Sequence, residues 1–314
     1  MKVFLGIDGG GSKTEGVLAG ADGRVLAAMK VGASAIVGRP SRRSLAVLHS
    51  LTQSLLRRAG RTRADVAFCA IGLNGIDFED EFAMQKSAIA RALGIPPRKI
   101  ALVNDAVVAL WGGSADPAAA LLQVGSGITS ALRSGFGSER TYDHLNAGSL
   151  FSLRHEILIR VARMIDGRIR PTPLKNAILR HLGVRDSAGY AELLYRGRLP
   201  WDRVARTPTI IFRFWLKGDP VARELVESAA RDYAVTASAM VRRTGSRKAT
   251  ALVGGGVINN APEAFRRLVH RRLREISPGA RPLKPVMSPA HGACVMAAFN
   301  AGEDPAAFYG KLVD

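Results

Sequence analysis

The sequence predicts an α/β fold built from two domains. The chain has 314 residues, 47% of them hydrophobic, which is enough to bury a large core. Three adjacent strand patterns open the chain, and alternating helical and strand patterns follow, an order typical of layered α/β domains. A second unit of strand, glycine turn and strand begins near residue 118 and resembles the first, which indicates an internal duplication.

The first domain is expected to span residues 1–112. Its opening run of Val3, Phe4, Leu5 and Ile7 is apolar throughout and predicts a buried strand. The expected elements, in chain order, are strands at 3–7, 15–19 and 24–29, a helix at 41–59, a strand at 66–71, a helix at 79–93 and a strand at 100–103. Small and turn-forming residues at 112–117 interrupt the pattern and mark the boundary.

The second domain is expected to span residues 113–289. Its elements are strands at 118–124 and 128–133, a mostly helical region at 148–243, a strand at 251–253 and a helix at 262–276. The C-terminal segment 290–314, with a helix at 290–300, is expected to return to the first domain.

The chain is strongly basic, since 45 Lys and Arg against 26 Asp and Glu give a formal charge of +19. The basic residues are spread along the whole chain, without an aromatic ladder or zinc-ligand spacing, so we do not expect a nucleic-acid partner. The densest basic cluster, at residues 266–274, is interpreted as the solvated face of a helix. The apolar face of that helix is expected to contain Phe265, Leu268, Val269, Leu273 and Ile276.

The sequence also predicts a location. No apolar run is long enough to cross a bilayer, and no secretory leader opens the chain. Cys69 and Cys294 lie in apolar segments and are expected to be buried free thiols. We therefore expect a cytoplasmic protein without a membrane partner.

The most informative stretch is a glycine-rich hairpin near the start of the chain. The first strand pattern ends on Asp8, and residues 9–14 read Gly-Gly-Gly-Ser-Lys-Thr before the next strand. Backbone N–H groups of such a bare turn can approach a phosphate closely, and Asp8 is placed to meet a divalent metal. Because no helix follows, the stretch is neither a Walker A loop nor a dinucleotide fingerprint. Taken alone, the hairpin could also be a plain tight turn.

Three further features follow the same logic. Asp105 comes directly after the strand pattern at 100–103, where α/β proteins bind ligands; capping of the next helix is an alternative and compatible role. Residues 125–127 form a second tight glycine turn between strands. Residues 254–256 are three glycines between a strand and a helix, where a flat ligand can lie against the backbone. Each could be only a turn, but the ordered set is specific.

In this order the motifs resemble those of the actin-like ATPase superfamily of sugar kinases, heat-shock 70 chaperones and actin. Within it, the chain is similar to the BadF/BadG/BcrA/BcrD ATPase family, which includes N-acetylglucosamine kinases and glucosamine kinases. The matching segments are residues 6–15, 103–106, 121–127, 252–257 and 288–293. The resemblance implies a two-domain, ribonuclease H-like fold with a deep nucleotide cleft between the domains. It also implies ATP and Mg²⁺ as cofactors and a small sugar or sugar derivative as acceptor, and it suggests a homodimer.

The resemblance assigns a role to each matched residue. Asp105 matches the general base that accepts the proton of the attacking hydroxyl, and Asp8 would organise Mg²⁺. The β- and γ-phosphates would be held by Gly10, Gly11, Ser12, Lys13 and Thr14. The second phosphate loop would be Gly125, Ser126 and Gly127, and the adenosine pocket would be lined by Gly254, Gly255 and Gly256.

The sugar-binding half departs from the family pattern. The family's Gly-Asp-Glu-Gly-Ser segment lacks its Asp-Glu pair here, where residues 141–149 read Thr-Tyr-Asp-His-Leu-Asn-Ala-Gly-Ser. The substrate candidates are Asn104, Asp143, His144 and Asn146; a polar surface loop is the alternative for the second and third of these. We therefore expect an altered acceptor and poor use of N-acetylglucosamine.

The leading hypothesis is an ATP-dependent kinase of a sugar or amino sugar. An ATPase that activates a redox partner would need an iron–sulfur cluster, and two distant cysteines without paired spacing argue against it. A nucleotide-binding ATPase or regulatory protein without kinase turnover stays as the alternative, because the sugar-site motif is degenerate.

Overall fold

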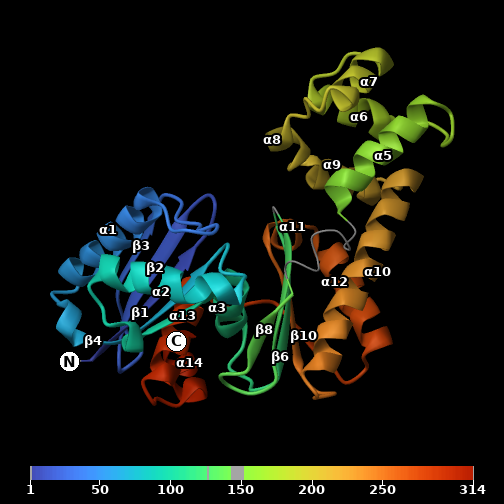
Figure 1. The fold of residues 1–314 in the computed structure, drawn as a ribbon. Coiled ribbons are helices and arrows are strands. Elements are labelled where there is room, and N and C mark those ends of the chain that lie inside the picture. The colour runs from blue at the N-terminus through green and yellow to red at the C-terminus, as the bar shows by residue number, and fades with distance from the viewer. Residues whose placement is uncertain (1, 126, 143–151, 314) are drawn as a thin grey trace.

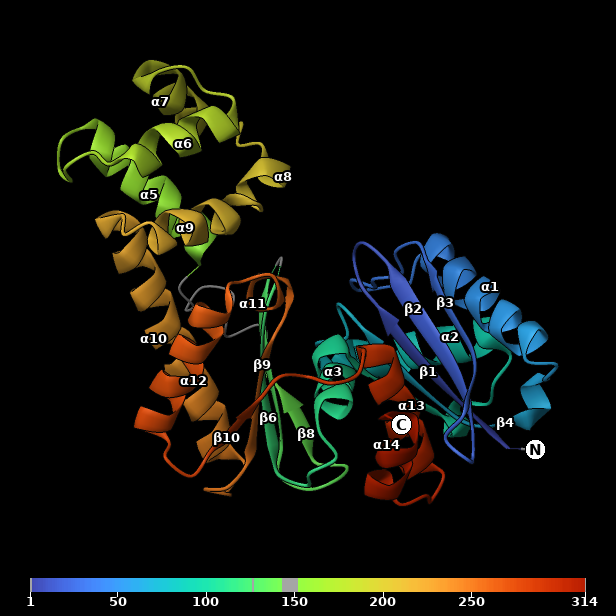
Figure 2. The same ribbon diagram turned by 180° about the vertical axis from the view of Figure 1, so that it is seen from behind.

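The computed structural model describes residues 2–125, 127–142 and 152–313. Two five-stranded sheets form the two halves of the molecule, which we call lobe I and lobe II. Helices α3 and α13 lie between the two sheets in both views of the ribbon (Figures 1 and 2). The α/β class predicted from the sequence is confirmed.

The sheet of lobe I has the strand order β3-β2-β1-β4-β5. Its strands are β1 (Val3–Gly9), β2 (Thr14–Gly20), β3 (Val25–Val31), β4 (Val66–Leu73) and β5 (Ile100–Asn104). The first three are antiparallel neighbours, whereas β4 is parallel to β1 and β5 is parallel to β4. Along β1, Leu5 and Ile7 pack on one face of the sheet and Phe4 packs on the other. Burial of both faces explains why this strand is apolar throughout.

The sheet of lobe II repeats this connectivity in the order β10-β9-β6-β7-β8. Its strands are β6 (Ala119–Val124), β7 (Ile128–Arg133), β8 (Glu139–Thr141), β9 (Thr250–Gly254) and β10 (Arg281–Leu283). The hairpin of β6 and β7 takes the place of β1 and β2, and β9 and β10 are the parallel strands. Lobe II thus repeats the strand arrangement of lobe I, as the resemblance between the two glycine hairpins predicted.

The helices cover the sheets and extend lobe II. Those of lobe I and the C-terminal segment are α1 (Arg42–Arg58), α2 (Glu79–Leu93), α3 (Asp105–Gly113), α13 (Pro289–Asn300) and α14 (Pro305–Val313). Those of lobe II are α5 (Leu153–Ile165), α6 (Pro173–Leu182), α7 (Ser187–Tyr195), α8 (Trp201–Val204), α9 (Thr207–Leu216), α10 (Pro220–Arg243), α11 (Gly256–Asn259) and α12 (Glu263–Ile276). Two 3₁₀ turns, Arg63–Asp65 and Pro97–Lys99, precede β4 and β5. Helices α5 to α9, which we call the helical insertion, project beyond the sheet of lobe II at one end of α10 (Figure 1).

Helix α3 is shared between the two lobes. Val108 and Trp111 belong to the apolar cluster of lobe I, whereas Ala109 and Leu110 pack with the apolar side chains of β6 and β7. A helix that is apolar on all sides is stable only when it is buried all round. The first residue of this helix is Asp105, so both lobes fix the position of that carboxylate.

The C-terminal helices pack on lobe I. Gly6 of β1 permits the close approach of α13, because a Cβ at this position would lie 2.5 Å from the backbone nitrogen of Cys294. On α14, Phe308 makes an edge-to-face contact with Phe4 at a centroid distance of 5.2 Å. We propose on this basis that the first domain comprises residues 1–112 with 290–314, and the second domain residues 113–289.

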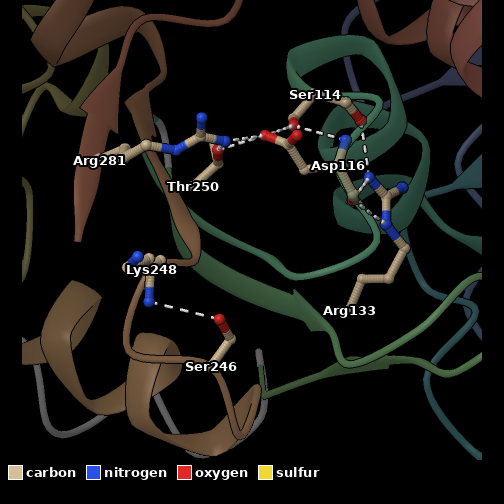
Figure 3. A network of polar contacts seen from close by, with 7 residues as sticks. All are labelled: Ser114, Asp116, Arg133, Ser246, Lys248, Thr250 and Arg281. Carbon is tan, nitrogen blue, oxygen red and sulfur yellow. Dashed lines mark hydrogen bonds and ion pairs between the residues drawn. The ribbon is translucent and has the colours of Figure 1, made fainter. Parts of the chain in front are cut away.

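The linker between α3 and β6 is anchored to lobe II by Arg133, a fully buried side chain of β7 (Figure 3). Its Nη2 donates to the Ser114 carbonyl at 2.7 Å, and its Nε donates to the Asp116 carbonyl at 3.0 Å. The carboxylate of Asp116 in turn accepts hydrogen bonds from Thr250 of β9 and Arg281 of β10. Polar contacts therefore hold the linker against three strands of lobe II.

Several details differ from the sequence predictions. Strands β8 and β10 were not predicted, because three residues are too few to show an alternation. The separate helix α14 was not predicted either. Ile276 was wrongly placed on the buried face of α12: it is the last residue of the helix and is 42% exposed, whereas Phe265 and Leu273 are buried as expected.

The predictions on the two cysteines and on membrane-spanning segments can also be compared with the structure. Cys69 and Cys294 are buried free thiols, as expected. No helix in the described part of the chain is both long and apolar enough to span a membrane.

Candidate functional site

The turn between β1 and β2 is an exposed, nearly bare loop. Gly10 N donates to the Lys13 carbonyl at 2.9 Å, which closes the turn. Gly11, Ser12 and Lys13 are exposed at its tip, and a Cβ built on Gly11 would meet no atom within 4 Å. The turn therefore offers backbone N–H groups and one ammonium to an anion beside it.

Thr14 lies below this turn rather than on it. It is the first residue of β2 and is fully buried. Its hydroxyl lies 2.8 Å from the Gly32 carbonyl and 2.7 Å from Ser34 Oγ. The side chain of Thr14 thus supports the turn, and only its neighbours in the expected phosphate set face solvent.

Two acidic side chains beside the turn, Asp8 and Asp105, are near enough to interact electrostatically. Burial raises the pKa of Asp8 to about 7, with the charges of Asp105 and Glu15 adding to the rise and Lys13 opposing it. Burial also raises the pKa of Asp105 to about 6. The Oδ1 atom of Asp105 is buried and has no hydrogen-bond partner among the described residues. Strand β1 and helix α3, far apart in the sequence, bring these two acids together.

Asn104, not Asp105, caps helix α3. Its Oδ1 accepts from Ala106 N at 2.8 Å, and its Nδ2 donates to Asp77 Oδ1 at 2.6 Å. The backbone N–H groups of Ala106 and Asp105 oppose the rise in the pKa of Asp105, whereas the charge of Asp77 adds to it. Because the side chain of Asn104 caps the helix, the carboxylate of Asp105 is not needed as the N-cap.

The second glycine turn joins β6 to β7. Gly125 N donates to the Gly127 carbonyl at 2.8 Å. The turn lies against the glycines that follow β9: a Cβ on Gly125 would stand 3.8 Å from Gly256 N. Gly255 has a φ of +92°, and a Cβ there would lie 2.5 Å from Val124 N, so no other residue fits.

A cavity of about 340 Å³, which we call the glycine-turn cavity, opens beside these glycines. Gly254 ends β9 and Gly256 opens α11 at its edge. The walls come from the second glycine turn, from the helical insertion and from the segment around α11. The lining residues are Gly125, Arg154, Ala205, Arg206, Pro208, Thr209, Phe212, Gly256, Val257 and Asn260.

A second cavity, of about 270 Å³, lies between the lobes and is called the interlobe cavity. Residues 76–79, Phe82, residues 102–104 and Val107 of lobe I line it, together with β8 of lobe II. Asn104, next to Asp105 in the sequence, is thus one of the residues that line this cavity. The other expected substrate residues, Asp143, His144 and Asn146, and Ser126 of the second turn, lie outside the described residues.

The residues around Asp8 fit a magnesium ion that is shared with a phosphate chain. Among the described residues, no three His, Cys, Asp or Glu side chains gather closely enough to hold a metal ion. Mg²⁺ commonly binds one or two carboxylates together with substrate phosphates and water. Two half-buried acids with raised pKa values, one of them with a buried oxygen that has no hydrogen-bond partner among the described residues, are a donor set that a cation would stabilise.

Sequence reasoning missed several residues of these cavities. Asp77 follows the carboxyl end of β4, so the argument that singled out Asp105 after β5 could have found it. Arg154, Phe212 and Asn260 come from the helical insertion and α11. No local pattern marks them, since they reach the site only through the packing of lobe II.

Comparison with known proteins places the chain in one family. The model of the BadF/BadG/BcrA/BcrD ATPase family matches residues 5–297. This span includes both glycine turns, the two carboxylates and the glycines after β9.

Individual relatives extend the comparison. The chain is 28% identical over 267 residues to an N-acetylmuramic acid/N-acetylglucosamine kinase from Clostridium acetobutylicum. The alignment covers 83% of this chain and 87% of the relative. It is 23% identical over 316 residues to an N-acetyl-D-glucosamine kinase from Dictyostelium discoideum, covering 94% and 98%. A crystal structure of a proposed N-acetylglucosamine kinase from Chromobacterium violaceum has a TM-score of 0.69 at 22% identity, covering 95% of this chain and 99% of that one. The predicted two-domain fold is thereby confirmed.

Proposed function

The chain belongs to the BadF/BadG/BcrA/BcrD ATPase family, and from this membership we propose that it is an ATP-dependent kinase of a sugar or amino sugar. The matched relatives named above are kinases of N-acetylated amino sugars, which supports this reaction class. One observation carries the proposal. The half-buried carboxylates of Asp8 and Asp105 lie beside a bare glycine turn, near enough for the charge of Asp105 to raise the pKa of Asp8.

Asp105 is proposed to act as the general base. With a pKa of about 6, it is ionised at neutral pH and still basic enough to accept the proton of an attacking hydroxyl. Its unpaired Oδ1 is the atom that would take this proton. A positioned base of this kind contributes roughly 10²–10⁴-fold in rate.

The nucleotide is proposed to lie between the two glycine turns. Gly10, Gly11, Ser12 and Lys13 would bind the terminal phosphates with backbone N–H groups and the Lys13 ammonium. Gly125 and Gly127, with Ser126, would bind the phosphate chain from lobe II. The glycines at 254–256 would let adenosine lie in the glycine-turn cavity.

Asp8 is proposed to hold Mg²⁺. When bound, the ion neutralises charge on the phosphate oxygens during phosphoryl transfer. The acceptor sugar would occupy the interlobe side of Asp105, where Asn104 is held by Asp77. We also propose a cytoplasmic location, which fits the two buried free thiols.

A screen of ADP release against a panel of sugars and amino sugars tests the proposal. We expect ADP release to depend on one or a few acceptors, with the phosphorylated sugar detected by mass spectrometry. A protein that binds ATP but whose ADP release no sugar accelerates would instead be a nucleotide-binding ATPase or regulatory protein without kinase turnover.

A further inference from the structure

Asp77 stands on a fixed loop at the carboxyl end of β4. Asn74 N donates to the Gly9 carbonyl at 2.9 Å, and Ile36 N donates to the Asn74 carbonyl at 3.0 Å. Gly75 has a φ of +92°, and a Cβ there would lie 1.7 Å from the Ile36 carbonyl oxygen, so the loop requires glycine at this position. These backbone contacts hold the loop against lobe I without the side chain of Asp77.

The side chain of Asp77 is exposed and lines the interlobe cavity, but its partner is buried. Asn104 is 4% exposed, and its Nδ2 donates to Asp77 Oδ1 at 2.6 Å. A side-chain amide carries its donor and its acceptor on opposite arms. With Nδ2 on the carboxylate, Oδ1 faces Ala106 N, from which it accepts at 2.8 Å. The reverse orientation of the amide would place its oxygen against the carboxylate.

The charge of Asp77 explains why an acid occupies this position. A hydroxyl or an amide can both donate and accept, so it would permit either orientation of the Asn104 amide. An ionised carboxylate can only accept, and it therefore selects the orientation that caps α3. This choice has an electrostatic cost, because the charge of Asp77 opposes ionisation of Asp105. An unfavourable arrangement of this kind is typical of functional sites.

The cap of α3 closes around Asp105, which stands between Asn104 and Ala106 in the sequence. The later residues of α3 are held by apolar packing against both lobes, so the cap mainly fixes the first turn. The carboxylate of Asp105 belongs to that turn and moves with it. A displacement of about 1 Å at a reacting group can lower the rate about 100-fold.

We propose that Asp77 is a positioning residue for the proposed phosphoryl transfer. By accepting the hydrogen bond of Asn104, it keeps that amide in the capping orientation and thereby fixes the carboxylate of Asp105. Asp77 acts through Asn104 and does not touch the reacting atoms. This inference rests on the proposed function, because it takes Asp105 to be the base.

Steady-state kinetics of the full-length protein test the inference, with the most active sugar of a panel of glucose, glucosamine, N-acetylglucosamine and N-acetylmuramic acid. Asp77→Ala removes the acceptor and should lower kcat by about 10–100-fold, with the KM for the sugar and the affinity for ATP within about twofold of wild type. Asp77→Asn keeps an acceptor oxygen but permits both amide orientations, so it should recover part of kcat.

A double variant tests the route through Asn104. Asp77→Ala combined with Asn104→Ala should have a kcat within about twofold of Asn104→Ala alone, because the contact is already lost. Hydrogen exchange at the Ala106 amide, followed by mass spectrometry, should be faster in Asp77→Ala than in wild type. This second measurement reports on the cap without requiring turnover.

Asp80→Asn is the matched control. Asp80 is exposed in the first turn of α2 and does not line the interlobe cavity, so this variant removes the same charge away from Asn104. Its kcat, its KM and the exchange at Ala106 should match wild type. Thermal melts show whether each variant is folded, and Asp77→Asn keeps the test available if Asp77→Ala is not.

The outcomes separate this inference from the proposed function. An unchanged kcat in Asp77→Ala, or equal losses in the Ala and Asn variants, would overturn the positioning role alone. A raised KM with unchanged kcat would instead make Asp77 a residue that contacts the sugar. Losses that multiply in the double variant would overturn the route through Asn104. A wild-type protein that phosphorylates no sugar would overturn both proposals.

Discussion

Replacing Asp105 by Asn should abolish activity and stabilise the protein at the same time. The amide keeps the size of the side chain but cannot accept a proton at neutral pH. If Asp105 is the base, turnover should fall by roughly 10²–10⁴-fold while ATP affinity stays near the wild-type value. In the wild type, kcat/KM should fall about tenfold per pH unit below the pKa of about 6, where the base becomes protonated.

The effect on stability has a definite sign. Burial raises the pKa of Asp105 from 3.8 to about 6, so the folded protein binds this proton more tightly than the unfolded chain does. The stabilising contribution is fully present below pH 3.8 and is lost as the pH rises through about 6. Since one pKa unit corresponds to 1.36 kcal/mol, the loss by pH 8 is about 3 kcal/mol. The Asn variant avoids that loss and also removes a charge that raises the pKa of Asp8.

Urea unfolding in the presence of EDTA measures this prediction. The variant should be more stable than the wild type by about 3 kcal/mol at pH 8, and the difference should shrink towards zero at pH 4. Asp202→Asn, at an exposed position, should change stability by less than about 0.5 kcal/mol at either pH. A stability difference that does not vary with pH would refute the raised pKa of Asp105. Near wild-type turnover in the variant would refute the role of Asp105 as the base.

The remaining predictions concern the metal, the acceptor and the linker. Asp8→Ala should weaken Mg²⁺-dependent ATP binding, since the metal loses its nearest carboxylate; an unchanged Mg²⁺ effect in ATP titrations would leave Asp8 a purely structural role. N-acetylglucosamine should be a poor substrate, because losing one buried charged hydrogen bond lowers kcat/KM roughly 10–100-fold. The prediction would be contradicted if N-acetylglucosamine were the best substrate in a panel with glucosamine and glucose. Arg133→Met should lower the free energy of unfolding by about 2–5 kcal/mol, because the Ser114 and Asp116 carbonyls lose their buried donor; a loss below about 1 kcal/mol in denaturant unfolding would contradict it.

Much of the fold could be predicted because its signals are local. A strand buried on both faces is apolar throughout, as in β1, and a strand–glycine–strand pattern is visible wherever it recurs. The two hairpins therefore predicted that lobe II repeats lobe I. They could not predict β8 or β10, whose three residues are defined only by the strands beside them.

The site residues also divide into those that a local sequence signal marks and those that no such signal marks. Asp8 and the glycines were found because each lies at or just after the end of a strand, next to a nearly bare turn. Arg154 and Asp77 were missed because they reach the cavities through contacts with residues far away in the sequence, Gly125 and Asn104. Arg133 gives no local signal at all, since an arginine at the end of a strand is ordinarily exposed. Its burial follows from the carbonyls of the linker that packs against it.

The pKa of Asp105 follows from the order of two adjacent residues. Asn104 takes the N-cap position of α3 and satisfies the N–H of Ala106, so the carboxylate of Asp105 has no capping duty. Burial by two lobes pushes the pKa of that carboxylate up, while the N–H groups at the start of α3 pull it down. The result, about 6, lies between a fully hydrated carboxyl and one buried without donors. With the two residues exchanged, the aspartate would be the cap and its pKa would fall, because a carboxylate that accepts backbone N–H bonds is stabilised in its charged form. The order Asn-Asp thus gives the helix a neutral cap and leaves the site a base that is ionised at neutral pH.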